Sequence, residues 1–114
     1  MKIKDVPNKV IVQTFLKAII EIIAESTSSK YSLLVVNGIK DRLCHTFKFS
    51  KSIRIQNNSI EVGQDVNSID KKELKNFFLK IIDMAGADYL KGLLTKRLNE
   101  KQISYLRVIG VKLC

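Results

Sequence analysis

The chain has one imidazole, His45, which directly follows a thiol, Cys44, and lies four residues after Asp41. A cysteine or serine nucleophile needs a positioned imidazole as its base, and an acidic residue one helical turn away could orient that ring. An ion pair on a helix surface is a far commoner role for such a pair of side chains. We therefore expect no catalytic residue here, and we interpret Cys44 as a buried thiol and His45 as a surface side chain.

The sequence also lacks the residues that metal and cofactor sites need. Cys44, Cys114 and His45 provide three soft ligands, fewer than the four or so of a structural zinc site. No phosphate-binding loop, dinucleotide fingerprint or zinc-protease motif occurs in the chain. We expect no metal, no cofactor and no enzymatic activity.

Positive charge is the clearest asymmetry, because 20 Lys and Arg face 11 Asp and Glu, a net charge of +9. Residues 40–54 hold five basic side chains against Asp41 alone, with Phe47 and Phe49 between them, and residues 91–112 form a second basic segment. Such segments can contact phosphates and stack bases. One hypothesis is therefore a protein that binds DNA or RNA through these residues: Lys48, Phe49, Lys51, Arg54, Lys96, Arg97, Lys101 and Arg107.

The simpler interpretation of this charge is the solvated surface of a lysine-rich protein. Only four of the 20 basic residues are Arg, whose guanidinium suits phosphate and base contacts better than the ammonium of Lys. The chain has no Trp and no signature of a known nucleic-acid-binding motif. Nucleic-acid binding is therefore the alternative hypothesis rather than the preferred one.

The preferred hypothesis comes from the first strongly periodic segment, residues 8–25. Its polar positions, Gln13, Lys17, Glu21 and Glu25, are spaced by four, and most of the others are apolar. A helix with so narrow a polar stripe must be covered on most sides, either as the central helix of the domain or in an oligomer interface. We favour a non-enzymatic regulatory or scaffolding module that acts through protein contacts as a homo-oligomer. The interface candidates are Ile19, Ile22 and Ile23.

The middle of the chain predicts a second helix and a β-hairpin. Residues 31–45 are either a helix or begin with a short strand over residues 32–36, and the length of the segment favours the helix. Residues 50–66 alternate apolar and polar side chains on both sides of Asn57-Asn58, a pair that suits a two-residue turn. Gly63 marks a bulge or the end of the returning strand.

Three helices are predicted after residue 68. Asp70 and Glu73 resemble a capping box ahead of an amphipathic helix that contains Phe77 and Phe78, and Gly86 interrupts this helix. A second helix covers about residues 87–98. Asn99 and Gln102 form another cap-like pair, which opens a last helix that ends at Gly110, and residues 111–113 form an extended tail or edge strand.

These elements make one α+β domain over residues 1–114: two N-terminal helices, a central β-hairpin and three C-terminal helices. The charged start lacks the features of a signal peptide, and charged positions within residues 8–25 are incompatible with a membrane span. Two cysteines are too few for a disulfide framework. We therefore predict a cytoplasmic protein without membrane contact.

Three local features resemble small uncharacterised archaeal proteins of similar length. They are Asn8-Lys9-Val10 at the start of a long helix, the run from Val66 to Leu74, and the ending Gly110-Val111-Lys112-Leu113. The resemblance spans most of the chain. It implies a helical domain with a central hairpin in an intracellular setting, and it implies no activity and no functional residues.

Overall fold

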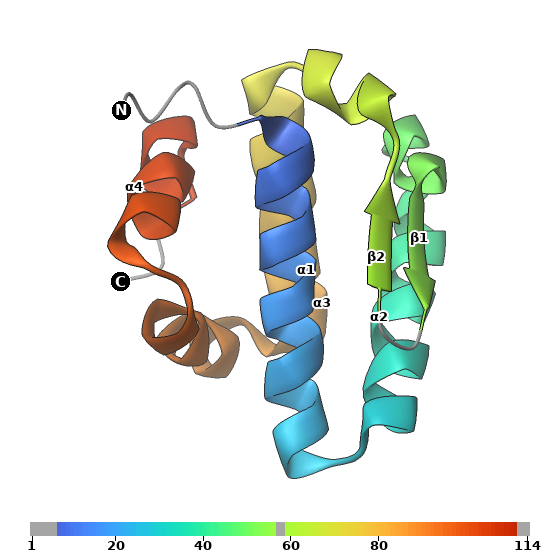
Figure 1. Ribbon diagram of the computed structural model, residues 1–114, viewed down its shortest axis with the longest axis vertical. Coiled ribbons are helices and arrows are strands. Elements are labelled where there is room, and N and C mark those ends of the chain that lie inside the picture. Colours follow the sequence, from blue (N-terminus) through green and yellow to red (C-terminus); the bar gives the residue numbers. More distant parts are fainter. Residues whose placement is uncertain (1–6, 57–58, 112–114) are drawn as a thin grey trace.

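Helices make up most of the chain in the computed structural model, which describes residues 7–56 and 59–111, apart from the side chains of residues 87 and 88 (Figure 1). The longer elements are α1 (Asn8–Ser26), α2 (Ser29–Leu43), β1 (Ile53–Gln56), β2 (Ser59–Val62), α3 (Lys71–Arg97) and α4 (Glu100–Ile109). This order confirms the predicted α+β class, with two N-terminal helices, a hairpin and then C-terminal helices. Residues 1–6 and most of the predicted extended tail lie outside the described residues.

Helix α1 is the central helix of the fold. It contacts α2, α3 and β2, so other elements of the same chain cover most of its apolar surface. The structure buries Ile19 and Ile22 in this core and half-buries Ile23. This corrects the assignment of Ile19 and Ile22 as interface candidates, because side chains that already pack inside the chain are not available to a second copy. Ile23 keeps part of its surface exposed, and its assignment stays a prediction.

Helix α2 settles the ambiguity of residues 31–45 in favour of a helix. Ser28 caps it, since its hydroxyl accepts a hydrogen bond from the backbone N–H of Tyr31 at 3.1 Å. One turn into the helix, the buried Ser32 donates its hydroxyl proton to the carbonyl oxygen of Ile20 at 2.6 Å. A polar side chain in the tight contact between α1 and α2 is thereby satisfied.

The predicted hairpin is present, but its strands are shorter than the alternation of apolar and polar residues predicts. Strands β1 and β2 pair antiparallel, with Ile53 opposite Val62 and Ile55 opposite Ile60. Short 3-10 helices, η2 (Lys48–Ser52) and η3 (Gln64–Ser68), replace the predicted strand ends. Gly63 ends β2 without a bulge, since its N–H continues the ladder to the carbonyl oxygen of Ser52 at 3.0 Å. The predicted turn residues 57 and 58 lie outside the described part of the chain.

The C-terminal helices begin and end at the predicted caps. Gly86 adopts a φ of 109°, which favours glycine, and the kink divides α3 into two helical segments as its sequence predicts. Asp70 caps α3 as predicted, but its carboxylate accepts the N–H of Lys72 rather than the N–H of Glu73 that the predicted capping box would use. Asn99 and Gln102 form a complete capping box at α4, and Gly110 ends that helix in the left-handed conformation.

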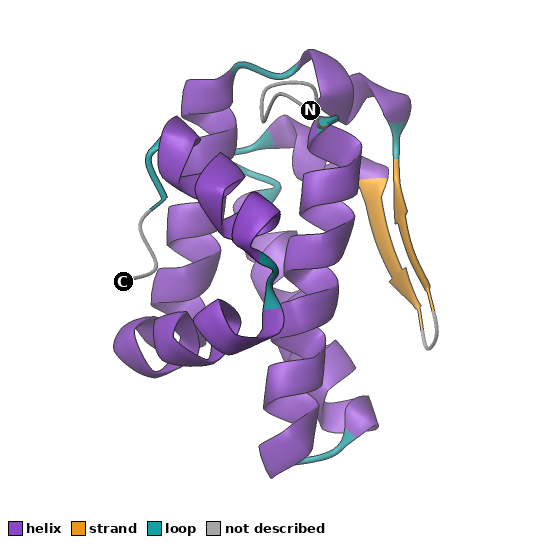
Figure 2. Cartoon of the chain, turned by 60° about the vertical axis from the view of Figure 1, so that its left-hand side comes forward, coloured by secondary structure: helices purple, strands orange, loops and turns teal. Residues whose placement is uncertain are grey.

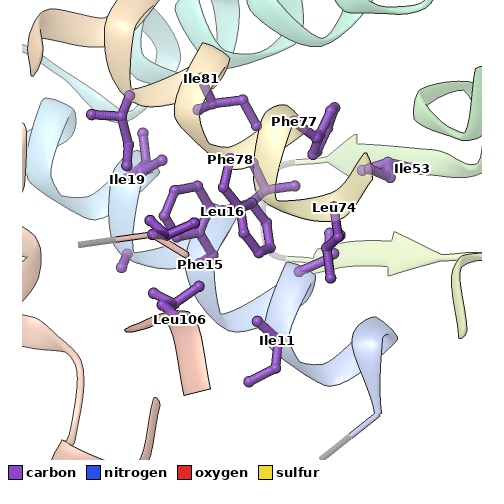
Figure 3. Packing of buried hydrophobic residues seen from close by; sticks show 14 of the residues in the cluster. Ile11, Phe15, Leu16, Ile19, Ile53, Leu74, Phe77, Phe78, Ile81 and Leu106 are labelled. Carbon is purple, nitrogen blue, oxygen red and sulfur yellow. The ribbon is translucent and has the colours of Figure 1, made fainter. Parts of the chain in front are cut away.

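One continuous core joins all of these elements (Figure 3). Phe78 packs on Phe15 of α1 with ring centroids 4.3 Å apart, whereas Phe77 meets Phe49 of η2 at 4.8 Å. Adjacent residues of α3 thus connect the two halves of the core. Helix α4 lies on one side of α1 and α3, and the ribbon formed by β1 and β2 lies with α2 on the other (Figures 1 and 2).

Candidate functional site

The residues considered for catalysis do not form a site. Helix α2 ends at Leu43, so Asp41 and His45 do not share a helical face. Asp41 lies 3.4 Å from the ammonium of Lys40, His45 is exposed, and the half-buried Cys44 directs its Sγ to the carbonyl oxygen of Lys40. Within the described residues no group of three His, Cys, Asp or Glu side chains could hold a metal ion.

The second basic segment is partly used inside the chain. The guanidinium of Arg97 lies 3.3 Å from a carboxylate oxygen of Glu21 and also pairs with Glu25, which ties the end of α3 to α1. This corrects the assignment of Arg97 as a nucleic-acid contact, because its charge is already balanced by two carboxylates. Lys96, Lys101 and Arg107 are exposed on α3 and α4.

The first basic segment is better placed for a ligand. Lys48 and Lys51 lie three residues apart on η2, where side chains at that spacing align, and Arg54 follows on β1. All three are exposed, and none takes part in the ion pairs of residues 7–56 and 59–111. Lys51 and Arg54 also line a shallow depression of about 450 Å³. We call Lys48, Lys51 and Arg54 the basic cluster.

The two basic segments do not form one continuous surface. The basic cluster lies on η2 and β1 beside α2, whereas Lys96, Lys101 and Arg107 lie on the last turns of α3 and on α4. Helices α1 and α3 separate these regions (Figure 1). A single ligand site therefore uses one segment or the other. The alignment of Lys48 with Lys51 on η2 and the depression that Lys51 shares with Arg54 favour the basic cluster.

Phe49 is not a stacking residue, and its assignment is corrected. Its side chain is only 8% exposed and faces Phe77 and Phe47, whose ring centroids lie 4.8 and 6.0 Å away. Edge-to-face contacts of this kind belong to a packed core. The ring therefore has no exposed face on which a nucleic-acid base could stack.

We expect Phe49→Ala to lower the free energy of unfolding by about 3 kcal/mol, the small end for a buried aromatic, because the site lies at the edge of the core. Urea titration followed by circular dichroism measures this change. Nucleic-acid binding, measured well below the unfolding transition, is expected to stay the same. A variant of unchanged stability but weaker binding would restore Phe49 as a stacking residue.

A groove of about 420 Å³ runs between α1, the start of α2 and the end of the ribbon where Gln56 pairs with Ser59. Ile20, Leu33 and Ile60 supply apolar walls, while Lys17 and Glu21 bring opposite charges to its rim. No buried side-chain donor or acceptor of the described residues lacks a partner. The groove therefore points to no particular ligand chemistry.

No pattern in the sequence indicates the side chains that hydrogen-bond to the outer backbone carbonyls of the ribbon. Gln13 of α1 donates its amide N–H to the carbonyl oxygen of Ile60 at 3.0 Å, and Asn37 of α2 reaches the carbonyl oxygen of Ile55 at 3.5 Å. Both contacts are made to residues of non-hydrogen-bonded pairs, whose backbone groups point away from the partner strand. Only the register of the hairpin could have indicated them.

Comparison with known protein families, curated proteins and solved structures finds no match to this chain. The resemblance to small archaeal proteins stays a hypothesis. Among the helices in the described part of the chain, none has the length and apolar character needed to cross a membrane.

Proposed function

We propose that this protein is a non-enzymatic nucleic-acid-binding module, that its basic cluster contacts phosphates, and that it works in the cytoplasm, where the thiol of Cys44 would stay reduced. The observation that carries the proposal is that Lys48, Lys51 and Arg54, on consecutive elements, are exposed and form no ion pair with any other described residue. A net charge of +9 adds a long-range attraction for any polyanion.

Binding at such a site is driven by the release of counterions from the phosphate backbone. Each cation that neutralises a phosphate displaces condensed salt ions, so the affinity falls as salt concentration rises. Phosphate contacts position a protein on nucleic acid without reading its sequence. The basic cluster alone therefore predicts binding that depends strongly on salt.

We expect the protein to bind a DNA duplex of about 20 base pairs at about 50 mM salt, with an affinity that falls linearly on a double logarithmic plot against salt. Changing Lys48, Lys51 and Arg54 together to Gln is expected to lower the slope by about three. Fluorescence anisotropy over a salt series measures both quantities.

The matched control changes three other exposed cations, Lys30, Lys72 and Lys80, to Gln and removes the same net charge. A slope that falls equally in both triple variants would show that only total charge matters. Absence of binding by the unmodified protein at low salt would reject the proposal outright, since non-specific basic binders are strongest there.

A homo-oligomer acting through protein contacts is the second candidate. It is supported by Tyr31 and Leu34, which lie one turn apart on the outer side of α2 with 53% and 67% of their surface exposed. We expect sedimentation velocity to detect a dimer at high protein concentration, and Leu34→Lys to shift it to monomer. A monomer at every concentration would remove this candidate.

A further inference from the structure

The ribbon has one buried face and one polar face. Ile53, Ile55 and Val62 point into the core, whereas the alternate positions Arg54, Gln56, Ser59 and Glu61 are exposed. The register places Arg54 opposite Glu61 and Gln56 opposite Ser59. We call these four side chains the ribbon face, and they form a compact two-by-two array.

Contacts within the chain do not account for this array. Arg54 and Glu61 are direct cross-strand neighbours, yet they form none of the ion pairs of the described residues. No side-chain hydrogen bond within residues 7–56 and 59–111 involves Gln56 or Ser59 either. All four side chains therefore keep their donors and acceptors available to a ligand.

The edges of the ribbon are less accessible than its face. Helix α1 contacts β2 and α2 contacts β1, and Gln13 and Asn37 occupy the carbonyl groups at the middle of each edge. A peptide that adds a strand needs a free edge. A ligand of this hairpin must therefore approach the ribbon face.

We propose that the ribbon face enters the major groove of double-stranded DNA and reads base edges there; this inference rests on the proposed function and names its nucleic acid. A two-stranded ribbon fits the roughly 12 Å width of that groove. The side chains match the readout chemistry: Arg pairs with guanine O6 and N7, Gln with adenine N6 and N7, Glu with cytosine N4, and Ser with several bases.

The basic cluster fits this placement. Lys48 and Lys51 lie on η2, which directly precedes and contacts β1, and Lys51 lines a depression with Arg54. Their ammonium groups are thus placed to contact the phosphates that border the groove. Arg54 lies where the two groups meet, and in the groove its guanidinium would pair with guanine while Lys48 and Lys51 contact phosphates. Phosphate contacts would fix the position of the ribbon, and the ribbon face would supply the specificity.

Duplex DNA fits better than the other nucleic acids. Single strands are usually held by exposed aromatic rings, but the aromatic rings of this region, Phe47 and Phe49, are buried. The major groove of A-form RNA is too deep and narrow for side chains to read. The ribbon face is therefore suited to the wide major groove of B-form DNA.

Selection from a pool of random DNA duplexes with the full chain tests the inference. We expect an enriched sequence that binds more tightly than its scrambled version. Gln56→Ala and Glu61→Gln are each expected to reduce this discrimination by roughly 5- to 150-fold while leaving the salt slope unchanged. Asn76→Ala, an exposed amide on α3, is the control and should leave both unchanged.

Methylation protection with dimethyl sulfate identifies the groove. The inference predicts protection of guanine N7, which lies in the major groove, rather than adenine N3, which lies in the minor groove. Salt-dependent binding without sequence discrimination, protection of adenine N3, or equal affinity for an RNA duplex would overturn the inference while leaving the proposed function intact. Absence of binding to any nucleic acid would instead reject the proposed function.

Discussion

Changing Phe77 or Phe78 to Ala is expected to lower the free energy of unfolding by about 3–5 kcal/mol. Both side chains are fully buried, and they pack in different directions. The Phe78 ring lies against Phe15 of α1, whereas the Phe77 ring lies against Phe47 and Phe49. Each substitution therefore opens a cavity in a different half of the core.

Urea titration followed by circular dichroism measures both losses. Met84→Ala on the same helix is the control, and it should cost much less because that side chain is partly exposed. Phe77→Leu is a milder variant that remains folded if the alanine variants do not. A loss below about 1 kcal/mol for either alanine variant would mean that α3 is peripheral rather than central.

Local signals explain why most of the fold could be predicted. The caps at Asp70 and Asn99 and the left-handed Gly110 act within a few residues, so their positions can be identified in the sequence. The four-residue spacing of polar side chains in α1 likewise predicts a helix with one narrow exposed stripe. These features depend little on distant parts of the chain.

The hairpin was predicted too long because tertiary contacts override the alternation at its ends. Ser50 is buried and donates its hydroxyl proton to the carbonyl oxygen of Lys40 at 3.0 Å. Ser52 donates to the carboxylate of Asp65 at 2.7 Å and so links η2 to η3. These bonds join residues 10 and 13 positions apart, and alternation alone does not reveal them.

The candidate site was only partly predictable for the same reason. The sequence shows a basic segment over residues 40–54, and Lys48, Lys51 and Arg54 are exposed in the structure. Arg97 could not be distinguished from them, because its partner Glu21 lies 76 positions away in the chain. An aromatic residue between lysines looks the same in the sequence whether it faces solvent or, as Phe49 does, the core.

A polar cluster that no periodicity indicates joins the ends of the fold. Asn8 is buried at the start of α1, and its amide donates to the carbonyl oxygens of Val66 and Ile69 at 3.1 and 3.2 Å. Its Oδ1 accepts from the ammonium of Lys71 and the hydroxyl of Tyr105, both at 2.8 Å. The Asn8 side chain therefore makes all four hydrogen bonds of which an amide is capable.

Two segments on which the resemblance to archaeal proteins rests meet at this cluster. Residues 8–10 contact residues 66–74 through Asn8 and through the N–H of Lys9, which donates to the side-chain oxygen of Asn67 at 2.8 Å. Tyr105 brings α4 to the same point and accepts a second hydrogen bond from Lys71 at 2.6 Å. The cluster thus joins α1, η3, α3 and α4.

Asn8→Ala is expected to lower the free energy of unfolding by about 3 kcal/mol, because several polar groups lose their partner in one substitution. Tyr105→Phe removes only the hydroxyl and should cost about 1–2 kcal/mol.

Since both residues share Lys71, their effects should not add, and a double-mutant cycle measured by urea titration should give a coupling of about 1 kcal/mol. Thr14→Ala, which removes a hydroxyl that bonds to Val10 of the same helix, is the control. Strict additivity of Asn8→Ala and Tyr105→Phe would mean that the two side chains stabilise the fold independently rather than as one cluster.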